Sequence, residues 1–381
     1  MSDATSQKLA IATAMSCLLT AHTLASPPNS PRSEVWQTNG PVLAITESEG
    51  IIYFGGQFDY VGPHTGSAVM ADKTTGAILS IPLIDGDVYA VTTDGAGGWY
   101  IGGGINSVGS TPTGGVVHLL ADGSLDPTFN TGSITGNVRA LVASGSRVYV
   151  GGNFTDINGQ PRNGLAAVDA VTGAVTTWNP GVGGPGPINA FAISGNTLYV
   201  GGNFSSIGGQ SRNGIAALDV TIDTNNATAW NPDANSFVRD LILLENKLYV
   251  AGHFTNIGGA PRNRIAALDT TMNTNNATLW NPGANGEVYT IALSAIDLST
   301  DVLTLYAGGE FTTIGGQNRN RIAALNVFLN TNNATSWNPN ANSTVQSLAV
   351  SGSTVYAGGL FTSVGGQPRN RIAALDATTG L

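Results

Sequence analysis

Residues Leu198 to Trp230 read LYVGGNFSSIGGQSRNGIAALDVTIDTNNATAW, and this stretch decides the fold. It opens with a β-favouring run that breaks at Gly201-Gly202. A Gly-Gly-Gln turn follows, then the small apolar segment Ile215 to Leu218, and the unit closes on Trp230 with Asn-Pro after it. Short apolar runs separated by Gly, Asn and Pro predict strands joined by tight turns.

The same unit recurs along nearly the whole chain. The tyrosine that precedes the glycine pair marks each copy, at Tyr53, Tyr100, Tyr149, Tyr199, Tyr249, Tyr306 and Tyr356. The period is therefore about 50 residues, and each unit holds four short β-like segments. Such a period is typical of the blades of a β-propeller.

Within one unit the sequence predicts four strands. The innermost alternates apolar and small residues, as in Val138 to Ala143, and the second carries the tyrosine, as in Arg147 to Val150. The third is Leu165 to Asp169, and the fourth leads into Trp178. The glycine pairs are expected to mark a kink or bulge in each second strand.

The two ends of the chain complement each other. The last repeat stops at Gly380-Leu381, after its third strand, and the first repeat is preceded by Val35–Asn39, which resembles an unpaired fourth strand. We therefore expect an all-β, seven-bladed β-propeller of four-stranded blades, its ring closed by the N-terminal strand completing the last blade. A fragment of a longer array is the alternative.

Composition restricts the class of protein. Charged residues make up 10% of the chain and glycine 51 of its 381 residues, which suits strands and turns and disfavours helical bundles. The net charge of −9 argues against a nucleic-acid binder, which would carry a basic face. Cys17 is the only cysteine, so the repeats contain no disulfide and no thiol chemistry.

The N-terminal region divides into two parts. Residues 1–25 contain an apolar run that ends in small residues and resemble a secretory signal peptide, although Asp3 offsets Lys8. The alternative is an arm that stays on the protein and docks on an assembly partner. Residues 26–34 form a Pro/Ser linker, and residues 35–381 form the propeller. No later stretch is apolar enough to span a membrane.

Three phrases carry a resemblance to a known family: YVGGNF from Tyr149, GQPRNGLAAVD from Gly159 and DGSLDPTF from Asp122. They are similar to the delta-sixty-type β-propeller repeats of bacterial surface and secreted proteins, which also have relatives in a fungal cortical polarity marker. The resemblance covers about Val35 to Leu381. It implies the propeller fold and a secreted or surface adhesive role, and it supplies no shared catalytic residues.

An Arg-Asn pair is the polar feature that recurs most regularly. On a propeller, its arginines would lie at one radius on one face, where guanidinium groups could bind carboxylates, sulfated glycans or phosphate. In the alternative interpretation each arginine caps loop carbonyls or pairs with the aspartate that ends the third strand. The candidate ligand-binding residues are Arg162, Arg212, Arg262, Arg319 and Arg369.

The sequence contains no clear metal, cofactor or catalytic motif. The Asp/Asn-rich loops 223–226, 273–276 and 330–333 could supply oxygen ligands to Ca²⁺, but they lack spaced carboxylates and suit ordinary turns. His64, His118 and His253 lie in different repeats and share no spacing, and no nucleophile elbow or phosphate loop is present.

These observations leave three functional hypotheses. The first is a non-enzymatic propeller, secreted or at a cell surface, that presents a loop face to a protein or glycan. Loops such as the insertion Ala295 to Asp301 would carry the binding. The second is a structural component of a virion or other extracellular assembly, with residues 1–34 as a docking arm. The third is a hydrolase or lyase with a site in the central channel, marked by carboxylates or histidines converging on the axis.

Overall fold

The computed structural model describes residues 38–61, 66–184, 186–294 and 303–381. The signal-peptide or arm segment, the linker, Val35–Gln37 and the insertion at 295–301 lie outside these ranges. Within them the chain is all β, and no helix long and apolar enough to cross a membrane is found there. The confirmed element of the prediction is an all-β fold of many separate antiparallel sheets.

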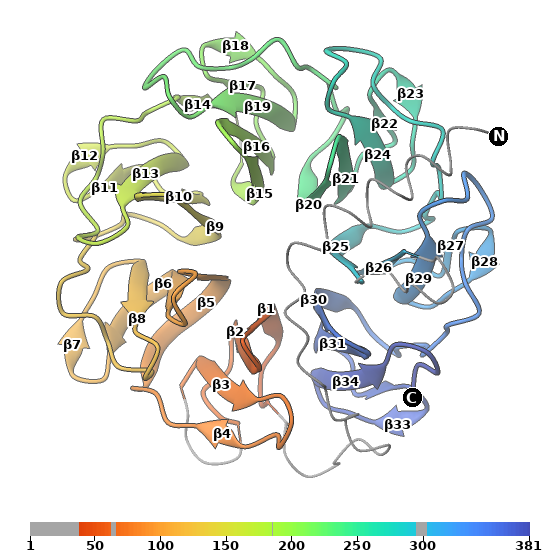
Figure 1. The fold of residues 1–381 in the computed structure, drawn as a ribbon, viewed down its shortest axis with the longest axis horizontal. Coiled ribbons are helices and arrows are strands. Elements are labelled where there is room, and N and C mark those ends of the chain that lie inside the picture. The colour runs from red at the N-terminus through yellow and green to blue at the C-terminus, as the bar shows by residue number, and fades with distance from the viewer. Residues whose placement is uncertain (1–37, 62–65, 185, 295–302) are drawn as a thin grey trace.

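Antiparallel sheets are arranged around a common centre, with the innermost strand of each nearest the middle (Figure 1). The innermost strands are β1 (Val42–Ser48), β5 (Ile84–Thr93), β9 (Val138–Ser144), β15 (Ile188–Ser194), β20 (Val238–Leu244), β25 (Val288–Leu293) and β30 (Val345–Ser351). Each packs beside the next in chain order, and β30 packs beside β1.

The second and third strands follow outward in the same order. The second strands are β2 (Ile51–Gly56), β6 (Trp99–Val108), β10 (Arg147–Gly152), β16 (Thr197–Gly202), β21 (Lys247–Gly252), β26 (Thr304–Gly309) and β31 (Thr354–Gly359). The third strands are β3 (Ala68–Asp72), β8 (Val116–Leu119), β13 (Leu165–Asp169), β19 (Ile215–Asp219), β24 (Ile265–Asp269), β29 (Ile322–Asn326) and β34 (Ile372–Asp376).

Short strands at the periphery complete the described elements. Most form hairpins across a two-residue Gly-Gly or Asn-Gly turn. They are β4 (Ile78–Leu79), β7 (Thr111–Pro112), β11 (Asp156–Ile157), β12 (Gln160–Pro161), β14 (Val182–Gly183), β17 (Ser206–Ile207), β18 (Gln210–Ser211), β22 (Asn256–Ile257), β23 (Ala260–Pro261), β27 (Thr313–Ile314), β28 (Gln317–Asn318), β32 (Ser363–Val364) and β33 (Gln367–Pro368).

The predicted fourth strand is mostly absent as a strand. The first sheet has β4 in this place, but other repeats show a single antiparallel bridge instead, such as Leu218↔Ala227 and Leu268↔Ala277. The segment is too short and too rich in Asn turns to extend a ladder. The expectation of four-stranded blades therefore holds in outline only.

The hydrophobic core lies between neighbouring sheets rather than in a single central mass. Tyr199 packs edge-on against Trp230 with ring centroids 5.2 Å apart, and the indole Nε1 then donates to the Asp269 carbonyl of the next repeat at 3.2 Å. The same edge-on Tyr–Trp contact recurs in three further repeats. One core cluster joins Ile52 and Phe54 of the first sheet to Tyr356 of the last.

Contacts between the first and last repeats follow the pattern of neighbouring repeats. Arg264 and Arg321 each donate to the carbonyl of an alanine in the next connecting segment, and Arg371 donates to the Thr38 carbonyl at 3.1 Å. Thr38 itself bridges Val61 of the first repeat. No sheet closes on itself within the described ranges, so closure by the N-terminal strand stays a prediction.

The glycine pair sets how closely the first two strands approach. A Cβ on the second glycine of each pair would lie 1.9–2.5 Å from a carbonyl oxygen in or just before the innermost strand, as at Gly252 and Phe237. The amide after that glycine, His253, donates to the same oxygen at 3.0 Å. Only a residue without a side chain permits this bond.

We predict that Gly252→Ala lowers the free energy of unfolding by roughly 2–4 kcal/mol, because its Cβ would overlap backbone atoms that cannot move aside. Urea unfolding of purified protein measures this. The matched control is Gly201→Ala at the first glycine, where a Cβ meets the side chain of Val238 and where the next repeat already carries Ala251. An equal loss in both variants would contradict the explanation.

Candidate functional site

A β-bulge occurs near the start of every innermost strand. In β9 the register passes from Val138 to Ala140 opposite the glycine pair, so that Arg139 has no partner in the ladder. The glycine pairs were expected to mark a bulge in the second strand; the extra residue lies instead on the innermost strand. A bulged residue is free of the pleat's alternation, so its side chain can be aimed independently of the sheet.

The bulged residues form what we call the axial ring. Each is half-buried, and each follows a buried Val or Ile that barely varies between repeats. The ring position itself varies widely in size, polarity and charge. Its members are Leu43, Tyr89, Arg139, Asn189, Arg239, Tyr289 and Gln346.

One side of the axial ring is a cluster of aromatic and charged side chains. The Arg239 guanidinium lies 4.6 Å from the centroid of Phe237 and 5.2 Å from that of Tyr289, and its Nε donates to the Glu287 carboxylate at 2.6 Å. Tyr289 donates its hydroxyl to Glu310 at 3.0 Å. Burial, followed by the charge of Glu287, raises the pKa of Tyr289 above its ordinary value. An arginine between two rings is held firmly and remains partly accessible.

The opposite side of the axial ring is less completely paired. The Arg139 guanidinium lies 5.2 Å from the Tyr89 ring, and the Tyr89 hydroxyl donates to Asp87 at 2.8 Å. Asp87 also accepts a hydrogen bond from Gln57 at 2.9 Å. Burial, followed by the hydrogen bond to Asp87, raises the pKa of Tyr89. Arg139 forms no ion pair with any described residue, and its buried Nε has no hydrogen-bond partner.

Asp240 stands immediately after Arg239, where other repeats have Ala, Thr or Ser. Its carboxylate accepts the backbone N–H of Ile291 from the neighbouring sheet at 2.8 Å and that of Leu241 at 2.8 Å. Burial outweighs these bonds and raises the pKa of Asp240 to about 6. The side chain therefore links two adjacent repeats just behind the axial ring.

The five arginines predicted as ligand-binding residues all cap loop carbonyls. Arg212, for example, donates to Ser211 O at 2.8 Å and to Thr228 O at 2.7 Å. Burial lowers the pKa of this guanidinium. Equivalent bonds are made by Arg162, Arg262 and Arg319, while Arg369 donates to Pro368 O.

The carbonyl-capping interpretation of these arginines therefore describes their contacts, and among the described residues no ion pair joins them to the aspartate of the third strand. Asp219 instead accepts the backbone N–H and the hydroxyl of Thr221, which holds its pKa below the ordinary value. Whether these guanidinium groups also bind a ligand stays a prediction.

The Asp/Asn-rich loops form tight turns. Asn225 adopts φ of 52°, and the buried Asn226 side chain donates to the Ile222 carbonyl at 3.0 Å. Asn276 and Asn333 repeat this bond. In the described part of the chain no three His, Cys, Asp or Glu side chains gather as metal ligands. The suggestion of Ca²⁺ stays untested.

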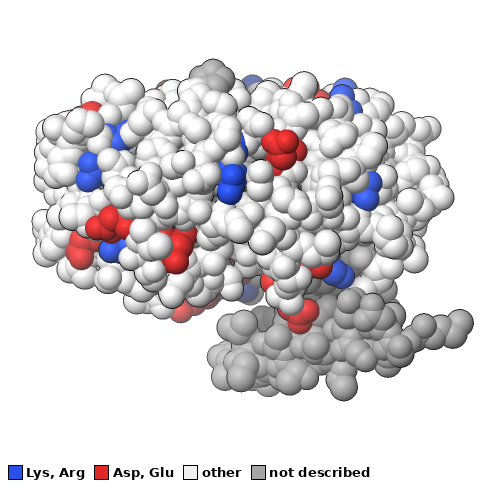
Figure 2. Space-filling model, turned by 90° about the horizontal axis from the view of Figure 1, so that it is seen from above, with Lys and Arg blue, Asp and Glu red and all other residues white. Residues whose placement is uncertain are grey.

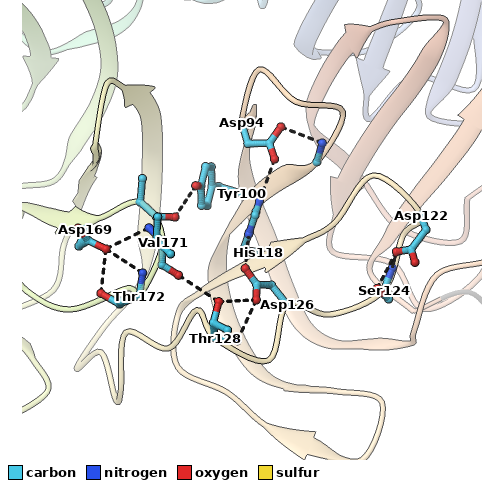
Figure 3. Close-up of polar contacts among 12 residues, drawn as sticks. Asp94, Tyr100, His118, Asp122, Ser124, Asp126, Thr128, Asp169, Val171 and Thr172 are labelled. Atoms are coloured by element: carbon cyan, nitrogen blue, oxygen red, sulfur yellow. Dashed lines mark hydrogen bonds and ion pairs between the residues drawn. The ribbon is translucent and has the colours of Figure 1, made fainter.

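His118 is held between two carboxylates in the second sheet (Figure 3). Its Nδ1 lies 2.9 Å from Asp126 Oδ2 and its Nε2 lies 3.1 Å from Asp94 Oδ2. Tyr100 stacks on the imidazole at a centroid distance of 4.3 Å and donates its hydroxyl to the Ala170 carbonyl of the next repeat. The cluster thus fastens two repeats together.

Charged groups elsewhere are sparse. On the face drawn in Figure 2, acidic and basic side chains are scattered without a continuous basic patch. The exposed large apolar residues of the described chain, such as Val171 and Leu279, are distributed over all the repeats. The axial ring, by contrast, contains aromatic, cationic and amide side chains at equivalent positions of the repeats.

A family model described as "Domain of unknown function (DUF5122) beta-propeller" matches the chain in five segments, residues 97–129, 146–166, 196–219, 246–270 and 304–326. Each segment includes a second strand and all or part of the third strand of one repeat, so the match follows the structural repeat. No curated protein matches the chain.

Solved structures resemble the chain over most of its length. The computationally designed Ika8 protein has a TM-score of 0.55 at 16% identity, with 91% of this chain and 86% of that one covered. The WD40 β-propeller domain of Doa1 has 0.53 at 11% identity, with coverage of 85% and 91%. A chain of the Mitotic Checkpoint Complex has 0.58 at 11% identity, with coverage of 90% and 95%. At these identities the likeness shows the fold alone. Together with the family match, it defines a β-propeller repeat protein.

Sequence reasoning missed the axial ring. The signal was present: within a nearly constant Val-x-small pattern, position x alone changes from Tyr to Arg to Asn. It was missed because alternation predicted that x lies in the pleat like any other residue, and a bulge is invisible to alternation. The His118 cluster was missed because its three members come from separate loops and strands.

We predict that Asp126→Asn lowers the free energy of unfolding at pH 7 by roughly 1–3 kcal/mol, because it removes a charge-assisted bond to a buried imidazole. Burial alone would raise the pKa of Asp126, but bonds from His118 and Thr128 hold it below its ordinary value. Its stabilisation is therefore present above pH 4 and disappears as the pH falls through the folded-state pKa.

Denaturant titrations of wild type and variant across pH 2–7 test this, and the two curves should converge at the acidic end. Asp122→Asn is the matched control, since Asp122 is exposed and bonds only to Ser124 nearby. A difference that persisted unchanged at pH 2 would contradict the electrostatic explanation.

The contribution of Asp240 to stability depends on pH in the opposite direction from that of Asp126. Because its folded-state pKa is raised to about 6, its protonated form is favoured in the native protein. Stability from this group is complete below about pH 4 and is lost as the pH rises through 6. We predict that the unfolding free energy of Asp240→Asn, measured relative to that of wild type, rises by about 3 kcal/mol between pH 4 and pH 7. Parallel pH profiles of the two proteins would show that Asp240 does not titrate in this way.

Proposed function

We propose that this protein is a non-enzymatic binding module, secreted or at a cell surface, that holds a protein or glycan partner at the axial ring. The observation that carries the proposal is the contrast between constant and variable positions. The residue before each bulge is always Val or Ile, whereas the bulged residue is Leu, Tyr, Arg, Asn or Gln. Framework demands do not explain this variety, since the bulged residue has no ladder partner.

The composition of the axial ring supports binding. Tyr and Arg are the side chains most often found at the energetic centres of interfaces, because they combine large contact area with hydrogen bonding. Arg239 is fixed by Glu287 and two rings before any partner arrives. Such preorganisation reduces the conformational entropy lost on association.

The finer architecture belongs to the same proposal. We infer seven blades around one axis, with the N-terminal strand completing the last blade. The packing of β30 beside β1 and the bond from Arg371 to Thr38 support this arrangement. In such a ring the seven bulged side chains would converge at one mouth of the central channel.

The enzyme hypothesis has one observation in its favour: carboxylates do gather beside the axial ring. Asp87 is bonded to Tyr89 and Gln57, Glu287 to Arg239, and Glu310 to Tyr289. Each of these carboxylates already accepts hydrogen bonds from a neighbour, which suits a recognition surface better than a free general base. The virion or assembly hypothesis depends on residues 1–34, outside the described ranges.

A photo-crosslinking amino acid at Gln346 tests the binding role, because Gln346 belongs to the ring and its Oε1 has no partner to lose. We expect a crosslinked adduct from the extracellular or envelope fraction of the native source, which mass spectrometry would identify as peptide or sugar. The same group at Leu279, which is 76% exposed away from the ring, is the control.

Excess unlabelled wild-type protein should abolish the adduct at Gln346, whereas the double variant Arg239→Ala, Tyr289→Ala should compete at least tenfold more weakly. Circular dichroism establishes that this variant is folded. Labelling at Leu279 that equals labelling at Gln346, or equal competition by the double variant, would contradict a partner at the axial ring.

A further inference from the structure

Two arginines occupy the same bulge position in repeats two apart, and they differ in their electrostatic partners. Arg239 donates from Nε to the Glu287 carboxylate of the next repeat. Arg139 makes no ion pair within the described chain, and its Nε is buried without a hydrogen-bond partner. The backbone of the two bulges has the same register, so the difference arises from the surrounding side chains.

The internal repeat shows which group is missing. The partner of Arg239 is Glu287, which directly precedes Val288 of β25 in the next repeat. In the repeat after that of Arg139, the equivalent position is Pro187, which directly precedes Ile188 of β15. Proline offers no carboxylate, and Arg139 lies over Tyr89 of the preceding repeat instead. A half-buried guanidinium thus lacks the counter-charge that its equivalent has, which is costly unless another anion supplies it.

Asp87 does not fill this role. Its Oδ2 is bonded to the hydroxyl of Tyr89 and to the amide of Gln57, and the structure contains no ion pair between Asp87 and Arg139. Asp87 is nevertheless close to Arg139, because it accepts a hydrogen bond from the hydroxyl of Tyr89, and Arg139 lies over the ring of that tyrosine. Its negative charge must therefore repel an anion that binds Arg139, and removal of that charge should raise the affinity for such an anion.

A second unsatisfied group lies on the same axial ring. The Oε1 atom of Gln346 is buried and has no hydrogen-bond partner. An amide oxygen accepts from N–H or O–H groups, whereas Arg139 donates to an anion. A peptide segment carries both complements, a backbone N–H and an acidic side chain, and a glutamate side chain is already what satisfies Arg239.

We propose that the ligand of the axial ring is an acidic peptide segment, whose side-chain carboxylate binds Arg139 as Glu287 binds Arg239. This assignment rests on the axial ring being the binding surface proposed above. The ligand carboxylate accepts hydrogen bonds from the guanidinium, and the Gln346 side chain turns so that its amide oxygen accepts a backbone N–H of the peptide. Because the protein carries a net charge of −9, the contact is local and acts against the overall field.

Titration of the full chain with hexaglutamate tests the assignment, with hexaglutamine as the neutral match. Salt at 0.15 M screens the overall repulsion beyond about 8 Å. We expect hexaglutamate to bind and hexaglutamine to bind at least tenfold more weakly. Arg139→Gln should weaken hexaglutamate binding roughly tenfold or more, as for loss of a charge-assisted bond. Asp87→Asn should strengthen it several-fold, because a competing negative charge is removed.

Arg369→Gln is the matched control on the outer arginines, since Arg369 keeps one carbonyl bond and lies away from the ring. Pro187→Glu gives a second test, because it offers Arg139 an internal carboxylate and should reduce hexaglutamate binding. Thermal unfolding establishes that each variant is folded before it is titrated.

Several outcomes would overturn the assignment. Loss of binding in Arg369→Gln but not in Arg139→Gln would place the acidic ligand on the outer arginines. Weaker binding by Asp87→Asn would indicate a cationic ligand, and binding of oligogalacturonate but not hexaglutamate would indicate an acidic glycan. If the crosslink at Gln346 forms while hexaglutamate does not bind, the axial ring remains the binding surface and only its ligand has been misassigned.

Discussion

The close approach of two backbones at the glycine pair is the constraint on which the rest of this structure depends. A carbonyl before each innermost strand lies where the Cβ of any larger residue would stand, and it accepts the amide that follows the glycine. This bond draws the second strand against the start of the first. The first strand then contains one residue more than its partner can match, and the bulge is the result.

From this constraint follow both the stable and the variable parts of the repeat. Side chains that stay in the pleat pack against the next sheet, and the Tyr–Trp pairs with their indole bonds join one repeat to the next. The bulged side chain lies outside the ladder, and in two places it contacts its equivalent in the neighbouring repeat. Arg239 and Tyr289 meet in this way, as do Arg139 and Tyr89.

The fold was more predictable than the site, for a physical reason. Repetition of Tyr-x-Gly-Gly at a fixed period amplifies a weak strand signal, because the same short segment is read several times. Arg162 and its equivalents stood out by the same repetition, and they cap carbonyls of the framework. Arg139 and Asp240 matter because they differ from their equivalents, and a search for recurrence passes over such residues. The His118 cluster depended on contacts between loops that no spacing encodes.

Three arginines with a left-handed backbone conformation have a further consequence. Arg264, Arg321 and Arg371 adopt φ near 65° where two other repeats have glycine, and each reaches the carbonyl of the following connection. The backbone conformation at this position is thus set by the turn and not by the residue type. An arginine there adds a hydrogen bond to the next repeat without changing the turn. Copies of the unit with glycine and copies with arginine share one shape but differ in how firmly they hold their neighbour. Duplication of such units could therefore adjust rigidity one copy at a time, without altering the geometry that the other copies require.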